Sequence, residues 1–183
     1  MELNLKLDFT SQATIDGCFT RIANDLFNTY KLILNGSEYL FTEIEFYLFV
    51  EDVHADKSTH KHKIPVGHWR AHSQGLDISL GFDDKTYDGG ILVRGIKKEK
   101  EYINGPRRVV AQIFQEFGSV FESNSGIRLV ESKHMERSIK RTTRVGITEK
   151  NSSGFSERMY NFYCEKENWN MKHYSAEIMK HYK

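Results

Sequence analysis

The stretch that most constrains the fold is Phe41–Val50, which reads FTEIEFYLFV. Side chains on a β-strand point alternately to the two faces of the sheet. One face would carry Thr42 and four apolar side chains, and it must lie against the core. The other would carry Glu43, Glu45 and Tyr47 between two phenylalanines. Carboxylates between aromatic rings indicate a cleft wall, where burial tunes proton affinity; a half-exposed strand with solvated glutamates is the alternative.

The length of 183 residues and the 39% hydrophobic content predict one domain, residues 1–183. Only two thiols, Cys18 and Cys164, argue against a disulfide scaffold or a cysteine zinc site. The start lacks a signal-peptide core, and no apolar run reaches membrane length, so we expect a cytoplasmic protein without a membrane partner. With a net charge of +1, a nucleic-acid surface would have to be a local patch.

Periodicity predicts the main elements. Alternation over Glu2–Phe9 predicts a strand, and helical spacing predicts a helix over Ala13–Tyr30. Asn35-Gly36 is a hairpin signal between Lys31–Leu34 and Glu38–Val50, which predicts antiparallel pairing. Further predicted strands are Leu76–Leu80, Gly90–Ile96, Ile127–Val130 and Arg158–Cys164, and further predicted helices are Arg107–Phe117, with an apolar face that includes Phe114 and Phe117, and, more weakly, Met171–Tyr182.

The least regular segment, Glu51–His72, holds five of the eight histidines. Some of its side chains could bind a metal: His54, His60, His62, Asp52 and Asp56. No cysteine lies nearby, and the spacing fits no standard zinc pattern, so we expect no metal there. The alternative is a polar loop over a cleft in which one histidine is functional.

Several arginines need partners. Arg94 lies inside an apolar strand and requires an acidic or phosphate partner, unless it extends to water at a sheet edge. Arg107 and Arg108 follow Asn104-Gly105-Pro106 at a helix start, where free backbone N–H groups could hold a phosphate or simply be capped. A run without acids suits either a phosphate backbone or a solvated face: Arg137, Lys140, Arg141 and Arg144.

The order of these motifs resembles the alkyladenine type of 3-methyladenine DNA glycosylase. The resemblance covers roughly Tyr30–Trp169 and rests on seven short motifs. They are Glu45-Phe46-Tyr47-Leu48, His60 in the following loop, Asp77-Ile78-Ser79, Leu92-Val93-Arg94-Gly95, Gly105-Pro106, Arg144-Val145-Gly146, and Phe162-Tyr163 with Trp169. The resemblance implies a single α+β domain with a curved, mainly antiparallel sheet flanked by helices.

The same resemblance implies an enzyme that flips a modified base out of DNA or another nucleic acid. Glu45 would activate the water that attacks the sugar, and Arg94 would orient both. Tyr47 and His60 would hold the flipped base, and Asp77 and Trp69 are further candidates for contacting it. Cleavage passes through an oxocarbenium-like state that a carboxylate stabilises, so neither a metal nor an organic cofactor is required. The implied backbone contacts are Arg107, Arg108, Arg141 and Arg144.

The chain departs from the family pattern at two places. Asp77 replaces an asparagine that controls which purine enters, and a carboxylate there could favour bases with exocyclic amino groups. The segment Gly67–Gly75 is shorter than the family's duplex-wedging hairpin, although Trp69 or Arg70 could substitute. The substrate could therefore be a single strand or a free nucleotide. A non-catalytic module that binds a nucleobase, a nucleotide or a protein is the alternative.

Overall fold

The computed structural model describes residues 2–83, 86–119, 121, 126–170 and 174–182, and its longest strand, β2 (Ser37–Val50), is the centre of the sheet. β1 (Tyr30–Leu34) pairs with the start of β2 in an antiparallel hairpin. The connecting residues Asn35 and Gly36 have φ angles of 45° and 87°. A two-residue hairpin turn of type I′ requires positive φ angles at both central residues, so the predicted turn is confirmed.

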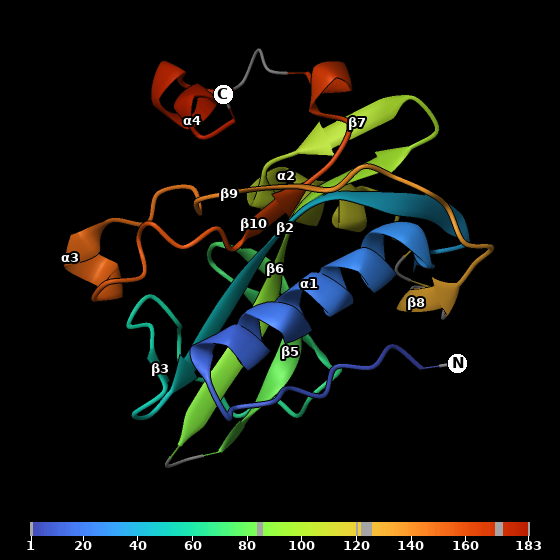
Figure 1. Cartoon of the computed structure of the whole chain (residues 1–183). Helices are drawn as coiled ribbons and strands as arrows, with labels where there is room; N and C mark the ends of the chain where they lie inside the picture. The colour runs from blue at the N-terminus through green and yellow to red at the C-terminus, as the bar shows by residue number, and fades with distance from the viewer. Residues whose placement is uncertain (1, 84–85, 120, 122–125, 171–173, 183) are drawn as a thin grey trace.

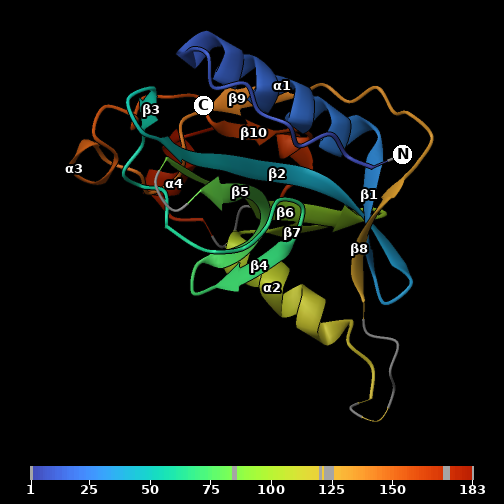
Figure 2. The same ribbon diagram turned by 90° about the horizontal axis from the view of Figure 1, so that it is seen from below.

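β2 changes neighbours along its length. The sheet order is β4-β5-β6-β2-β1-β8, and every pairing in it is antiparallel. Past the hairpin, one edge of β2 pairs with β6 and the other with β10, which makes the sheet curl (Figures 1 and 2). The other strands are β3 (His54–Ala55), β4 (Trp69–His72), β5 (Gly75–Asp83), β6 (Tyr87–Lys98), β7 (Glu101–Asn104), β8 (Ile127–Glu131), β9 (Lys140–Thr142) and β10 (Asn161–Tyr163).

A register shift interrupts β2 between Phe41 and Ile44. It lies opposite Gly95, where an added Cβ would sit 2.6 Å from the Thr42 hydroxyl, so only glycine fits. The strict alternation predicted for this stretch is therefore wrong at its start. Phe41 packs in the core, whereas Glu43 and Glu45 lie buried farther along the strand.

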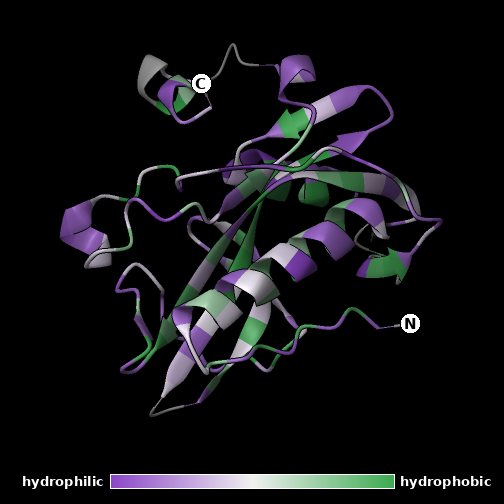
Figure 3. Cartoon of the chain, in the orientation of Figure 1, coloured by the Kyte–Doolittle hydropathy of each residue, from purple (hydrophilic) through white to green (hydrophobic). Residues whose placement is uncertain are grey.

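Helices cover the sheet on two sides. α1 (Gln12–Asn28) begins at a capping box between Ser11 and Thr14 and buries an apolar stripe against β1 and β2. α2 (Pro106–Gln115) packs against β5 and β6 on the other side (Figure 2). Figure 3 shows hydrophobic residues concentrated in β2 and β6 between them. The structure is thus the single α+β domain with a curved antiparallel sheet that the sequence predicts.

Two predictions are wrong: the strand over residues 2–9 and the buried position of Phe114 and Phe117. Residues 2–9 form no strand; their leucines pack on the core, while Arg21 donates to the carbonyls of Asn4 (2.6 Å) and Lys6 (2.7 Å). Those carbonyls are therefore bonded to a helix side chain rather than to a neighbouring strand. On α2, Phe114 was expected to be buried but is 65% exposed, and Phe117 is exposed too, because the helix extends past the sheet.

The last part of the chain is built from short elements. They are α3 (Glu149–Ser152), the 3₁₀ turn η1 (Lys166–Asn168) and α4 (Ala176–Lys180). The predicted strand over 158–164 exists only as β10. The predicted helix over 171–182 exists as α4, and its residues 171–173 lie outside the described ranges. Within those ranges, every helix falls short of the length and apolar character that a bilayer crossing needs.

One histidine of the irregular segment lies in the core. His54 is fully buried and packs against the rings of Phe155 and Tyr160. Its Nδ1 lies 3.0 Å from Gln12 Oε1, and its Nε2 has no partner among the described residues. Burial lowers the pKa of His54 from 6.5 to about 4, since a charged imidazole would lose its hydration there.

We predict that His54 makes the fold acid-sensitive. The unfolded chain takes up this proton near pH 6.5 and the folded chain only near pH 4, so stability falls as the pH drops through that window. By pH 4.5 the loss should be about 2 to 3 kcal/mol. Urea unfolding at pH 7 and 4.5 measures it, and His54→Phe should show a correspondingly smaller loss. An equal pH dependence in both proteins would contradict the assignment.

Candidate functional site

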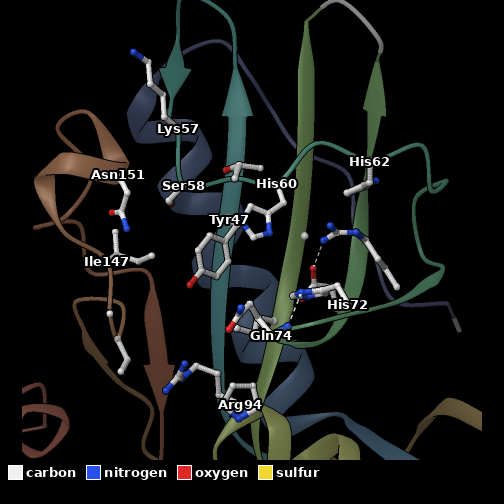
Figure 4. Close-up of a pocket in the computed structure, with 18 residues that line it drawn as sticks. Tyr47, Lys57, Ser58, His60, His62, His72, Gln74, Arg94, Ile147 and Asn151 are labelled. Atoms are coloured by element: carbon white, nitrogen blue, oxygen red, sulfur yellow. Dashed lines mark hydrogen bonds and ion pairs between the residues drawn. The ribbon is translucent and has the colours of Figure 1, made fainter.

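A cavity of about 400 Å³ opens where β2, β5 and β6 pass beside the loop between β3 and β4. Figure 4 shows Tyr47, His60, His72 and Gln74 pointing into it from different elements, whereas the amine of Lys57 points away. The rest of the lining combines polar and apolar residues and is supplied by Ser58, Thr59, His62, Arg70, Asp77, Gly90, Leu92, Arg94, Pro106, Val145, Gly146, Ile147 and Asn151.

Arg94 lies at one end of this cavity and binds two carboxylates. Its Nε lies 2.7 Å from Glu43 Oε1, and its Nη1 lies 3.4 Å from Glu45 Oε2. Both glutamates are fully buried. Burial alone would lower the pKa of Arg94, but the two carboxylates outweigh it and hold that pKa well above its usual value. The acidic partner predicted for Arg94 is thus present.

Glu45 is held by four donors. Its Oε1 accepts from the Val145 backbone N–H (2.7 Å) and from Asn161 Nδ2 (3.0 Å). Its Oε2 accepts from the Tyr47 hydroxyl (2.8 Å) and from Arg94. Glu45 does not line the cavity, but Tyr47, Arg94 and Val145 do. The predicted catalytic carboxylate therefore lies directly behind the cavity wall.

Glu43 is joined to Glu45 through shared donors. Asn161 Nδ2 also donates to Glu43 Oε1 at 2.7 Å, and the Tyr182 hydroxyl donates to the same oxygen. Glu43 Oε2 has no partner among the described residues. Neither Asn161 nor Tyr182 was predicted as a site residue from the sequence. Asn161 directly precedes the Phe162-Tyr163 motif, which is a weak signal, but nothing in the sequence marks the distant Tyr182.

Tyr47 is fixed from behind by a second buried ion pair. The Arg144 guanidinium lies 4.7 Å from the Tyr47 ring centre and donates to Asp56 Oδ2 at 2.6 Å. Burial and the nearby Glu45 charge raise the pKa of Tyr47 well above its usual value, so the hydroxyl stays a donor. Arg144 is fully buried. The prediction that it contacts a phosphate backbone is therefore wrong.

The opposite wall is a cluster of three polar side chains. Asp77 Oδ2 accepts from Arg70 Nη1 at 2.8 Å, and Asp77 Oδ1 lies 2.9 Å from His72 Nε2 (Figure 4). The His60 ring, which is exposed, lies 6.3 Å from the His72 ring between their centres. Tyr47, His60, Asp77 and Arg94, which were predicted as site residues, thus line one cavity.

Trp69 does not belong to this cavity. Its indole N–H donates to the Ile127 carbonyl at 3.1 Å, and its ring packs on the core. Trp69 and Arg70 are neighbours on β4, so their side chains point to opposite faces of the sheet. The predicted base-binding role of Trp69 is wrong for this reason, and Arg70 takes the place on the cavity side.

The predicted basic surface is not continuous. Arg137, like Arg144, forms an ion pair within the protein: its Nε lies 2.9 Å from Glu165 Oε1. Arg141 is exposed and lies over the Phe162 ring. Arg107 and Arg108 are also exposed, and Arg107 Nη2 reaches Gln74 at the cavity with a 3.4 Å contact. Phosphate binding by these three exposed arginines stays a prediction.

The histidines considered as metal ligands lie in different environments. His54 is in the core, whereas His60 and His62 line the cavity, where His62 Nε2 lies 3.0 Å from the Gly89 carbonyl oxygen. Among the described residues, no group of three or more histidine, cysteine, aspartate or glutamate side chains is arranged to hold a metal ion.

Comparison with known proteins adds little about activity. No family model matches the chain. A relative is the uncharacterized protein L759 of Acanthamoeba polyphaga mimivirus, which is 32% identical over a region that covers 54% of this chain and 57% of that protein. The chain is thus similar to a viral protein over about half the length of each. Neither finding bears on the resemblance to alkyladenine glycosylases, which stays a hypothesis.

We predict that Tyr182→Phe lowers the free energy of unfolding by about 1 to 3 kcal/mol, because it leaves the buried Glu43 carboxylate without one donor. Tyr174→Phe is the matched control, since the buried Tyr174 hydroxyl has no hydrogen-bond partner among the described residues. Urea unfolding of both variants measures the difference. Equal losses in the two variants would show that the Tyr182 hydroxyl does not support Glu43.

Proposed function

We propose that the cavity binds a modified nucleobase and that the protein hydrolyses the N-glycosidic bond joining this base to its sugar in nucleic acid. The observation that carries the proposal is the arrangement of Glu45. It is a buried carboxylate held in one orientation, bonded to both an aromatic side chain and an arginine that line the cavity. Such preorganisation suits a group that acts on a bound substrate.

The shape of the cavity supports base binding. Its volume of about 400 Å³ is within the range of small-molecule sites. Tyr47 offers an aromatic ring to the cavity, and His60 offers a second ring. Stacking between such side chains is how enzymes hold a base taken out of a strand. The exposed position of His60 would let it close over a base that has entered.

The chemistry would proceed by attack of water on the anomeric carbon. Glu45 takes a proton from the water while the base leaves with the electron pair of the glycosidic bond, and the carboxylate stabilises the positive charge that develops on the sugar. The contact from Arg94 to Glu45, at 3.4 Å, is the longest of the four at this carboxylate. A water that donates to Glu45 Oε2 would therefore compete with the weakest of the four hydrogen bonds, the one from Arg94.

A second function, base binding without hydrolysis, is favoured by one observation. All four hydrogen bonds of Glu45 are internal, and the carboxylate itself does not line the cavity. In that case Glu45 would only position Tyr47 and Arg94. Both functions use the same cavity, and they differ in whether a base is released.

We predict that Glu45→Gln lowers base release by at least about 100-fold while binding is retained, because an amide cannot take the proton. The assay incubates DNA and RNA oligonucleotides, single-stranded and duplex, that carry a panel of modified bases, and it scores released base. Glu38→Gln, at an exposed position of the same strand, should keep full activity. Full release by Glu45→Gln would rule out the catalytic role, and binding without release by the native protein would establish the second function.

A further inference from the structure

The geometry points to Arg70 as a specificity-determining residue that makes the cavity prefer bases with ring carbonyl oxygens over bases with exocyclic amino groups. This inference rests on the proposed function only in that the cavity holds a base. It names the chemical class of that base, and it does not depend on hydrolysis.

Both oxygens of the Asp77 carboxylate already have a partner. Oδ2 accepts from Arg70 at 2.8 Å, and Oδ1 is paired with His72 at 2.9 Å. On the side of β6, an added Cβ at Gly90 would lie only 3.1 Å from Asp77 Oδ2, so the carboxylate rests against that strand. The sequence alone suggested that Asp77 would accept from an amino group of the base. In the structure, each carboxylate oxygen is instead paired with a side chain of β4.

Arg70 is therefore held in place with donors to spare. A guanidinium carries five N–H donors and no acceptor. Among the described residues, only Nη1 of Arg70 has a hydrogen-bond partner, so Nε and Nη2 stay available in a side chain that is 15% exposed and lines the cavity. Arg94 adds a similar group, because its Nε and Nη1 bind the glutamates and its Nη2 has no partner in the described part of the chain.

Two acceptor groups of the cavity already have donors, in contrast. Each Asp77 oxygen is paired with a side chain of β4, and Gln74 Oε1 accepts from Arg107. The walls therefore present cationic N–H donors of Arg70 and Arg94, which have no partner among the described residues, beside these partnered acceptors. The complementary ligand brings oxygen acceptors. Hypoxanthine and uracil, the oxo counterparts of adenine and cytosine, carry them where the amino bases present further donors that would face Arg70.

The test measures equilibrium binding of nucleosides by calorimetry, using inosine against adenosine and uridine against cytidine. The oxo member of each pair should bind at least about tenfold more tightly, the scale of one hydrogen bond to a charged donor. Arg70→Met should remove that preference by weakening inosine binding without weakening adenosine binding. Arg128→Met, which changes an exposed arginine on β8 outside the cavity lining, should keep the preference.

A double variant, Arg70→Met with Asp77→Asn, removes both partners of the ion pair and should also lose the preference if the single variant fails to fold. Equal or tighter binding of the amino members, or an equal loss for both members in Arg70→Met, would overturn the inference. So would competition by inorganic phosphate that depends on Arg70, because it would make Arg70 an anion site.

The failures of the two proposals are distinguishable. An oxo preference that depends on Arg70, without release of any base from oligonucleotides, would keep this inference and remove the hydrolase. Base release without an oxo preference would keep the hydrolase and remove the role of Arg70.

Discussion

The structure depends on one buried interaction, the guanidinium of Arg94 between the carboxylates of Glu43 and Glu45. Charged groups inside a protein are tolerated only when they are paired and hydrogen-bonded. Apart from the Tyr47 hydroxyl, the remaining donors come from the last third of the chain, namely the Val145 backbone, Asn161 and Tyr182. These hydrogen bonds join the C-terminal part of the chain to β2 at the end of the cavity where Arg94 lies.

The same principle is repeated around the cavity. Arg144, paired with Asp56, supports the ring of Tyr47 from behind, and Asp77 with His72 holds Arg70 on the opposite wall. The groups that line the cavity are thus positioned by partners that do not need the ligand. Side chains that are paired in this way would need little further ordering if a ligand entered the cavity.

Features that depend on neighbouring residues could be predicted from the sequence. Asn35-Gly36 marked the hairpin, the apolar stripe marked α1, and an arginine in an apolar strand required an acid. Long-range pairing could not be predicted. Arg144 resembled a member of a solvated basic run because its partner Asp56 is 88 positions away, and Tyr182 reaches Glu43 from the end of the chain. Trp69 and Arg70 were both candidates until the face of β4 was known.

The most direct measurement of the central claim is the unfolding free energy of Arg94→Met, alone and combined with Glu43→Gln and Glu45→Gln. If Arg94 stabilises two buried carboxylates, the single variant should lose about 3 to 5 kcal/mol, because it leaves charges uncompensated. The triple variant should regain a large part of this loss, since no charge is left to compensate. A single-variant loss below about 1 kcal/mol, or a triple variant no more stable than the single one, would contradict the account.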